Sequence, residues 1–335
     1  MAYASVYKNV PAKKQTLRLI QMIRRKCSFV LPTRNVAKHI APLLKAIYSQ
    51  EYEGDIEILI MDSSDDRTPD IVKEFPVRFV RVEPDDYNYG KTRNEGAAIT
   101  DGEFLVFLST DVEIKDKRWL AKLTSHFSDP QVAGVYGRQI PKPGTEPMEQ
   151  FFITQTYSTE SHSQSLKEGQ LRHGMVVFSN TNTAIRRTVW EKIKIPEMLK
   201  TEDQEWAKRV LMAGYKVVYD AAASVYHSHY YSIESVFHEY FDSGATMPIV
   251  NTGIAKYSIV DFIGDGLKYV YGEYKFMIKN GYIHWLPYAV IYDIAKFMGI
   301  FLGSKQKYMP VWMKRALCKK KNHWDKYKDV IQEAI

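Results

Sequence analysis

Three aspartates in this sequence stand where enzymes often place catalytic carboxylates. Asp62 and Asp111 closely follow apolar runs that read as buried strands, and Asp203 lies in TEDQEW, at the start of a helical pattern. A carboxylate just beyond a buried strand can bind a divalent cation such as Mg²⁺ or Mn²⁺, which neutralises a departing diphosphate. A carboxylate at a helix start can act as a general base. Turn and capping roles are the alternatives, and Thr201 with Gln204 fits a capping box around the last of the three.

Two histidines and one arginine could complete such a centre. His227 and His229 are two residues apart in YHSHY, after the last strand pattern, so both would point to the same side of a strand. We expect His229 to share a metal ion with Asp111, and His227 is the second choice. Arg93 lies in NYGKTRN, in the first turn of a helical pattern, where a cation can bind phosphate. The alternatives are that the two histidines have structural roles and that Arg93 is a surface charge on a helix.

A sheet of parallel strands would position these side chains. Short β-branched runs alternate with helical patterns between residues 27 and about 140, which is typical of βα units. Ligands of such sheets bind beyond the carboxyl ends of the strands, where the polar residues described above lie. The expected strands are Cys27–Leu31, Asp55–Met61, Val77–Val82, Glu103–Leu108, Gln131–Tyr136, Lys216–Tyr219 and Ser224–His227, with regular structure also at Val176–Thr183 and helices at Ile40–Tyr48, Lys91–Ile99, Trp119–Phe127 and Glu202–Ala213.

The pattern changes twice after residue 140. Pro141–Pro147 reads as a loop, and the polar stretch that continues through Gln170 has no clear period. From Ile233 onward no strand pattern remains, and helices are expected. We therefore expect a basic N-terminal extension at residues 1–25, a catalytic domain at 26–232 and a helical region at 233–335.

Composition excludes several classes of protein. Of the 335 residues, 45% are hydrophobic and 25% charged, and the mean hydropathy is −0.33, which is ordinary for a globular protein and excludes intrinsic disorder. Cys27 and Cys318 are the only cysteines, so a disulfide framework and a cysteine metal cluster are excluded. The sequence has no uninterrupted apolar run of about 20 residues, as a spanning helix needs, and no secretory signal pattern. We expect a cytoplasmic location.

Charge and aromatic residues indicate a surface partner. The net charge is +7, with a pI near 9.0, and Lys and Arg concentrate at both ends of the chain. Aromatic rings beside lysines are typical of a membrane interface. Residues 282–328 predict an interfacial segment, held against the anionic inner face of the plasma membrane by the seven Lys and Arg between Lys314 and Lys328, which include Lys319, Lys320 and Lys321. A solvated basic face is the alternative, and we expect no nucleic-acid partner.

Taken together, these strings resemble one family. The chain resembles the inverting family-2 glycosyltransferases with the GT-A fold, and the bacterial rhamnosyltransferases in particular. The strings similar to successive motifs of that family are FVLPTRN, MDSSDDRT, NYGKTRNEGAA, GEFLVFLSTD, VYGRQIP, FSNTNTAIRRTVW, TEDQEWAKRVLMAGYKVVYD and VYHSHYYS. The resemblance spans nearly the whole chain. It implies an α/β nucleotide-diphospho-sugar transferase fold, a mostly parallel central sheet flanked by helices, with a C-terminal helical appendage. One departure is the metal motif, generally D-x-D, of which Ser109-Thr110-Asp111 keeps only the last carboxylate.

The resemblance also implies a reaction. The enzyme would move a sugar, expected to be L-rhamnose from dTDP-L-rhamnose, onto a hydroxyl of a surface glycan that is free or lipid-linked. Asp203 would accept the proton of that hydroxyl, while Mg²⁺ or Mn²⁺ on Asp111 and His229, with Arg93, would stabilise charge on the diphosphate. The implied donor-binding residues are Pro32, Thr33, Arg34, Asp62, Ser64, Arg93, Thr110 and Asp111, and the acceptor-binding residues are Asn180, Asn182, Glu202 and Trp206. Two alternatives stay open: a transferase for another UDP- or dTDP-sugar, and a catalytically degenerate scaffold docked on a membrane.

Overall fold

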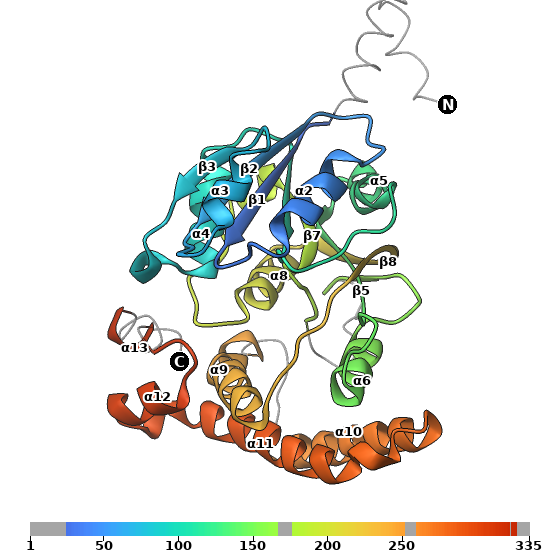
Figure 1. Cartoon of the computed structure of the whole chain (residues 1–335), viewed down its shortest axis with the longest axis vertical. Coiled ribbons are helices and arrows are strands. Elements are labelled where there is room, and N and C mark those ends of the chain that lie inside the picture. Colours follow the sequence, from blue (N-terminus) through green and yellow to red (C-terminus); the bar gives the residue numbers. More distant parts are fainter. Residues whose placement is uncertain (1–24, 167–175, 252–258, 322, 327–335) are drawn as a thin grey trace, which may run out of the picture.

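One mixed sheet of eight strands lies at the centre of the protein. The structure is a computed structural model that describes residues 25–166, 176–251, 259–321 and 323–326, so the expected extension at residues 1–25 lies almost wholly outside it. The strand order is β3-β2-β1-β4-β7-β5-β8-β6 (Figure 1). The strands are β1 Cys27–Thr33, β2 Ile56–Asp62, β3 Arg78–Arg81, β4 Phe104–Leu108, β5 Val132–Ile140, β6 His162–Gln164, β7 Asn182–Arg186 and β8 Lys216–Tyr226.

Alternate residues of the parallel strands belong to two separate cores. In β1, Phe29 and Leu31 pack on one side of the sheet and Val30 packs on the other, as the period of two in a strand requires. The helices that cover the first side are α2 Ile40–Tyr48, α3 Thr68–Val72 and α5 Trp119–Ser125, and those that contribute to the second are α4 Tyr89–Ala98, α6 Pro147–Thr156 and α8 Glu202–Met212. Burial on both sides explains why these strands are apolar throughout.

The second half of the sheet brings the end of β8 close to the loop after β4. β4 pairs antiparallel with β7, β7 antiparallel with β5, and β5 parallel with β8. Beyond β4, Glu113 forms an isolated bridge with Tyr226, in which each N–H donates to the other residue's carbonyl at 2.9 Å. Four of the seven strand pairings are parallel, in agreement with the mostly parallel sheet expected. The bridge brings Asp111 beside the residues that follow β8.

The polar stretch through Gln170, which shows no period in the sequence, contains regular structure. Its elements are helix α6 and the short strand β6. Helix α6 buries Pro147, Met148, Glu149, Phe151 and Ile153. Because α6 is covered on several sides, and one of its buried residues is a glutamate, its sequence lacks the single apolar stripe that predicts a surface helix.

Two strand boundaries also differ from the expectation. The segments Lys216–Tyr219 and Ser224–His227 are parts of one strand, β8, which pairs with β5 across register shifts. The regular structure expected at Val176–Thr183 overlaps β7 only at its end, because β7 begins at Asn182. Irregular backbone over residues 176–181 therefore leaves this segment free to contact neighbouring loops.

Beyond β8, the described residues form helices. These are α9 Ile233–Asn251, α10 Ile259–Lys279, α11 Leu286–Ser304, α12 Val311–Leu317 and α13 His323–Lys326, with 3₁₀ turns at Ile283–Trp285 and Gln306–Tyr308. In Figure 1, α10 and α11 line the lower end of the molecule, below α9 and α6. The helices pack on the sheet-bearing part, since Met148 of α6 lies in one core with Val236 and Met277, and Leu199 lies in another with Phe241. The domain boundary after residue 232 stays a prediction.

Two of the C-terminal lysines make contacts inside the protein. Lys319 Nζ donates to Glu239 Oε2 at 2.9 Å, and Lys320 Nζ lies 3.9 Å from the centre of the Tyr89 ring and 3.2 Å from the Leu199 carbonyl. Burial lowers the pKa of Lys320 to about 8. Both ammonium groups are therefore already bonded within the protein, and a lipid contact for Lys319 or Lys320 stays a prediction.

One helical stretch of the described chain, Ile283–Ser304, is long and apolar enough to cross a membrane by length and composition. An 18-residue window of this stretch has a mean hydropathy of 1.3, and 33% of that window is buried inside the protein.

Candidate active site and metal centre

Asp111, His227 and His229 form a group that can hold a metal ion. One carboxylate oxygen and one nitrogen of each imidazole all lie within 4.8 Å of one another. His227 Nε2 is 3.5 Å from Asp111 Oδ1, and His229 Nδ1 is 3.8 Å from Asp111 Oδ2. The structure thus brings Asp111 and His229 together and adds His227, the second choice of the sequence pattern.

The protonation states of this group suit a cation. Burial alone would raise the pKa of Asp111, yet contacts with His227 and His229 hold that pKa well below its usual value, so the carboxylate is ionised. His229 is partly exposed, but the burial of the rest of its ring lowers its pKa to about 4, so it is neutral near pH 7. An ionised carboxylate and a neutral imidazole, as in Asp111 and His229, are the forms that bind a divalent metal.

Gln139 of β5 determines which nitrogen of His227 is free. His227 Nδ1 lies 2.7 Å from Gln139 Oε1. The nitrogen of the same amide donates to Tyr157 Oη at 2.5 Å and to Ser179 Oγ at 3.2 Å, so the amide oxygen faces the imidazole as an acceptor. His227 therefore carries its proton on Nδ1. Its buried Nε2 has no hydrogen-bond partner among the described residues, and such a lone pair fits a bound cation.

Replacing Gln139 by Leu is expected to weaken binding of a divalent metal by about 10- to 100-fold, the usual effect of losing a residue that orients a metal-binding histidine. Isothermal titration of the purified chain with Mn²⁺ measures this. Gln164→Leu is the matched control, because Gln164 is equally buried but bonds to Tyr136 and Val177 instead. Equal Mn²⁺ affinity in the two variants would contradict the role given to Gln139.

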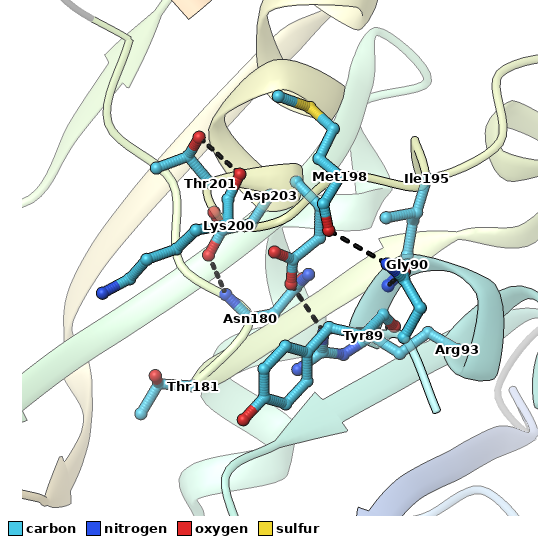
Figure 2. A network of polar contacts seen from close by, with 12 residues as sticks. Tyr89, Gly90, Arg93, Asn180, Thr181, Ile195, Met198, Lys200, Thr201 and Asp203 are labelled. Carbon is cyan, nitrogen blue, oxygen red and sulfur yellow. Dashed lines mark hydrogen bonds and ion pairs between the residues drawn. The ribbon is translucent and has the colours of Figure 1, made fainter. Parts of the chain in front are cut away.

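Asp203 is held at the start of α8 by backbone N–H groups. Its Oδ2 accepts from the Asn180 N–H at 3.0 Å, as Figure 2 shows, and its Oδ1 accepts from the Gln204 N–H at 2.9 Å. The capping box, the alternative interpretation of this segment, is not formed, since Thr201 has a φ of 60° and its hydroxyl makes no cap hydrogen bond. Burial, with the charge of Glu202 adding to it, raises the pKa of Asp203 to about 6. A carboxylate with this pKa is suited to accept a proton near neutral pH.

The segment Ser179–Thr181 connects Asp203 to the metal-binding group. The Ser109 N–H donates to the Thr181 carbonyl at 3.1 Å, two residues before Asp111 in the chain. Ser179 accepts from Gln139, which contacts His227. Between them, Asn180 contacts Asp203, and its buried Nδ2 has no hydrogen-bond partner in the part of the chain that the structure describes. One short segment therefore contacts both Asp203 and the metal-binding group, and it offers an amide N–H, unpaired within the described residues, as a hydrogen-bond donor.

Arg93 and Glu202 form a buried ion pair. Arg93 Nη1 lies 2.7 Å from Glu202 Oε1, and the two side chains are only 7% and 8% exposed. The guanidinium also lies over the rings of Tyr89 and Phe107. Breaking such a pair leaves an uncompensated buried charge, so the two residues hold α4 and α8 together. The pair engages both side chains with each other, while the buried Arg93 Nε has no hydrogen-bond partner among the described residues, and the donor role expected of Arg93 and the acceptor role expected of Glu202 stay predictions.

Trp206 and Asn182 are also structural. Trp206 is 1% exposed, its indole N–H donates to the Ile193 carbonyl at 2.9 Å, and it packs against Phe178. Asn182 is fully buried and joins Trp119 Nε1 to the Ala223 carbonyl. Neither side chain can contact a glycan, so the acceptor roles expected for them are wrong. Of the four acceptor residues expected, only Asn180 has a buried side-chain polar atom without a hydrogen-bond partner among the described residues.

The edge after β1 and β2 is built around Asp62. This fully buried carboxylate accepts from Thr33 Oγ1 at 2.7 Å, Ser64 Oγ at 2.6 Å and Arg81 Nη1 at 2.7 Å. Pro32 and Thr110 are buried as well, whereas Arg34 is exposed. The buried side chains therefore give this edge its shape, which leaves its backbone and Arg34 to contact a donor.

Sequence reasoning missed three contributors to the site. Gln139 and Tyr157 orient His227, and Lys142 Nζ donates to the Asp111 carbonyl at 2.6 Å. The string VYGRQIP contains Gln139, but a single buried amide carries no periodic signal. Tyr157 follows α6, the helix that the sequence did not predict.

Curated relatives match the chain along most of its length. A family model described as Glycosyl transferase family 2 matches residues 28–194. The O-antigen chain rhamnosyltransferase RfbN of Salmonella typhimurium is 32% identical over 308 residues, which cover 90% of this chain and 96% of that protein. The O-antigen chain rhamnosyltransferase WbaN of Salmonella anatum is 34% identical over 275 residues, covering 80% of this chain and 85% of that one.

Solved structures share the fold at low identity. The mannosyltransferase PcManGT from Pyrobaculum calidifontis, in complex with GDP-Man and Mn²⁺, aligns with a TM-score of 0.53 at 16% identity, over 85% of this chain and 87% of that chain. TarS of S. aureus aligns with a TM-score of 0.52 at 19% identity, over 92% of this chain and 54% of that chain. The GT-A fold expected from the sequence is confirmed. The chain belongs to glycosyltransferase family 2 and is a glycosyltransferase.

Proposed function

We propose that this glycosyltransferase moves L-rhamnose from dTDP-L-rhamnose to a hydroxyl of a glycan acceptor, free or lipid-linked, with inversion at C1. The observation that carries the reaction type is the Ser179–Thr181 segment, which contacts both a carboxylate with a raised pKa and a group suited to a divalent metal. The names of the two Salmonella relatives support rhamnose as the sugar.

Asp203 serves as the general base in this proposal. The acceptor oxygen forms its bond to C1 of the sugar while the bond from C1 to the diphosphate oxygen breaks, and the nucleoside diphosphate leaves with that electron pair. The proton of the acceptor hydroxyl passes to Asp203. The free Nδ2 of Asn180, adjacent to this carboxylate, would donate a hydrogen bond to the acceptor and orient it.

Asp111, His227 and His229 would hold the metal ion. When bound, a divalent cation neutralises charge that develops on the leaving diphosphate. Two imidazoles in the ligand set favour a transition metal such as Mn²⁺ over Mg²⁺, which prefers oxygen ligands. The Mn²⁺ complex of PcManGT supports this choice. Lys142, whose ammonium bonds to the Asp111 carbonyl, would take the charge-stabilising role expected of Arg93.

The donor would lie along the edge beyond β1, β2 and β4. The residues expected to bind it are Pro32, Thr33, Arg34, Asp62, Ser64, Thr110 and Asp111; of these, Arg34 and Asp111 have exposed or partly exposed side chains. The others would act through backbone groups and by shaping the edge. The location that fits these substrates is the cytoplasm, with a peripheral contact at the inner face of the plasma membrane.

A donor panel tests this proposal. Thermal melting of the purified chain with Mn²⁺ is measured in the presence of dTDP-L-rhamnose or of UDP-sugars. Separate, unheated samples with a glycan acceptor are assayed for release of nucleoside diphosphate. A donor at 100 times its Kd should stabilise the fold by about 2.7 kcal/mol. If only a UDP-sugar stabilises the chain and is turned over, the donor is that UDP-sugar and not dTDP-L-rhamnose. If a donor binds but is not turned over with any acceptor, the degenerate scaffold is favoured.

The rate should fall in acid. Since the pKa of Asp203 is raised to about 6, the base is ionised above that pH and protonated below it, so kcat/KM should be halved near pH 6 and fall about tenfold for each further unit. Initial rates at saturating Mn²⁺ from pH 5 to pH 8 measure the profile. A profile that stays flat down to pH 5 would show that Asp203 is not the base.

A further inference from the structure

Helix α11 has the reverse of the polarity expected of a helix on a soluble protein. Its only charged residues, Asp293 and Lys296, are 4% and 5% exposed. The opposite side of the helix carries an exposed stripe made up of Val290, Ile291, Ile294, Met298 and Phe301. A helix between protein and water places its charges outward and its apolar residues inward. The outward side of α11 is therefore built for an apolar neighbour.

Lys296 of α11 is held by contacts inside the helical region, in a buried cluster of charged residues that also contains Asp293. Lys296 Nζ donates to Tyr269 Oη at 2.8 Å, and Tyr269 Oη lies 3.4 Å from Oε1 of Glu273, a fully buried residue of α10. Burial, with the charge of Asp293 adding to it, raises the pKa of Glu273 to about 9. These contacts fix the rotation of α11, so its apolar stripe cannot turn inward without exposing or breaking this cluster.

Helix α10 adds a second apolar stripe. Val260, Ile263, Leu267, Tyr271 and Ile278 recur at helical spacing, and all are more than half exposed. Exposed charges of both signs flank this stripe, including Lys268, Lys275 and Lys279. Phe297 of α11 packs against Phe262 and Tyr269 of α10, so the two helices form one body. We name the two stripes together the outer helix face.

The chain that follows α10 is almost free of acidic groups, whereas α10 itself carries the exposed Asp261 and Asp265. From Ile283 to Lys321 the sequence contains one acidic residue, the buried Asp293, and eight Lys or Arg. Lys305 and Lys307 are exposed just after α11, each beside an aromatic ring. Tyr308 and Trp312 are 75% and 70% exposed. Apolar surface bordered by lysines and amphipathic rings complements an anionic lipid surface.

We propose that the outer helix face docks on an anionic lipid bilayer, with α11 lying in the interface and not across it. Crossing is opposed by packing, because Gly299 and Gly303 bring α11 so close to α9 that a Cβ on Gly303 would lie 2.2 Å from the Phe241 carbonyl. Asp293 and Lys296 would also have to enter the hydrocarbon. The residues that carry the docking are the exposed apolar stripes and Lys305 and Lys307, in place of Lys319 and Lys320.

Cosedimentation of the full chain with vesicles tests this surface independently of any transferase activity. We expect binding to vesicles of phosphatidylglycerol mixed with phosphatidylcholine, weaker binding to phosphatidylcholine alone, and loss of binding as salt rises. The double variant Ile294→Asp, Met298→Asp should bind the vesicles at least about tenfold more weakly, because two charges would enter the interface. Lys305→Gln with Lys307→Gln should reduce binding to anionic vesicles only.

Met212→Asp is the matched control, since Met212 is as exposed as Ile294 but lies at the end of α8. It should bind vesicles like the unmodified chain, and thermal melting should show that all variants fold. No sedimentation at low salt would overturn the proposal, as would equal binding by the Met212 and Ile294/Met298 variants. A third outcome is that neither protein binds vesicles, the unmodified chain is a dimer and the Ile294/Met298 variant is a monomer. The outer helix face would then bind a second copy of the chain, and the lipid proposal would be overturned.

Discussion

An Asp203→Asn enzyme is expected to turn over about 10²- to 10⁴-fold more slowly than the unmodified enzyme, because the amide keeps the size of the side chain but cannot accept the acceptor proton. The amide oxygen can still accept one of the two backbone hydrogen bonds that hold Asp203, so α8 should form normally. Steady-state release of nucleoside diphosphate measures the loss.

Two controls separate catalysis from folding in that experiment. Asp70→Asn makes the same chemical change at an exposed site in α3, where the carboxylate pairs with Lys73, and should leave the rate unchanged. Donor-induced thermal stabilisation should persist in the Asp203 variant. If this variant keeps a near-normal kcat, or loses activity only because it melts early, Asp203 has a structural role and another group accepts the proton.

Asp111→Asn should lower turnover by about 10²-fold or more, equivalent to about 2.7 kcal/mol of barrier, because the variant lacks the carboxylate of the metal-binding group. The backbone carbonyl of residue 111 can still bind Lys142, so the loop should keep its shape. A chelator should reduce the unmodified enzyme to a similar rate, and added Mn²⁺ should restore that enzyme only.

The outcome of chelation decides where the diphosphate charge is neutralised. Full activity in EDTA, together with an active Asp111→Asn enzyme, would mean that protein cations alone stabilise the leaving group. Lys142→Met would then become the variant with the larger effect, since its ammonium is held beside Asp111.

The structure brings Asp111 and His229 together, as the sequence pattern indicates, for a physical reason. Asp111 and His229 follow strands, and strand ends meet at sheet edges whatever the details of packing. By contrast, Trp206 and Asn182 lie in the mostly polar strings TEDQEW and SNTNTA, which suggest side chains exposed for binding a ligand. Only three-dimensional packing decides that Trp206 faces Phe178 and that Asn182 binds Trp119.

Partners distant in sequence explain the other differences. Arg93 reads as a free cation at a helix start, and its partner Glu202 is 109 residues away. Gln139 and His227 are 88 residues apart, and they meet because β5 and β8 are neighbours. Helix α6 was missed because it is buried on more than one side. In each case, the pairing depends on which strands and helices become neighbours, and local patterns do not determine this.

The position of Lys320 has a consequence for biosynthesis. Its ammonium lies over the ring of Tyr89, at the start of α4, and bonds to the Leu199 carbonyl. A ribosome makes Tyr89 long before it makes Lys320. A nascent chain therefore reaches its final arrangement around Tyr89 only after the C-terminal helices have emerged, and this region cannot be completed in order from the N-terminus.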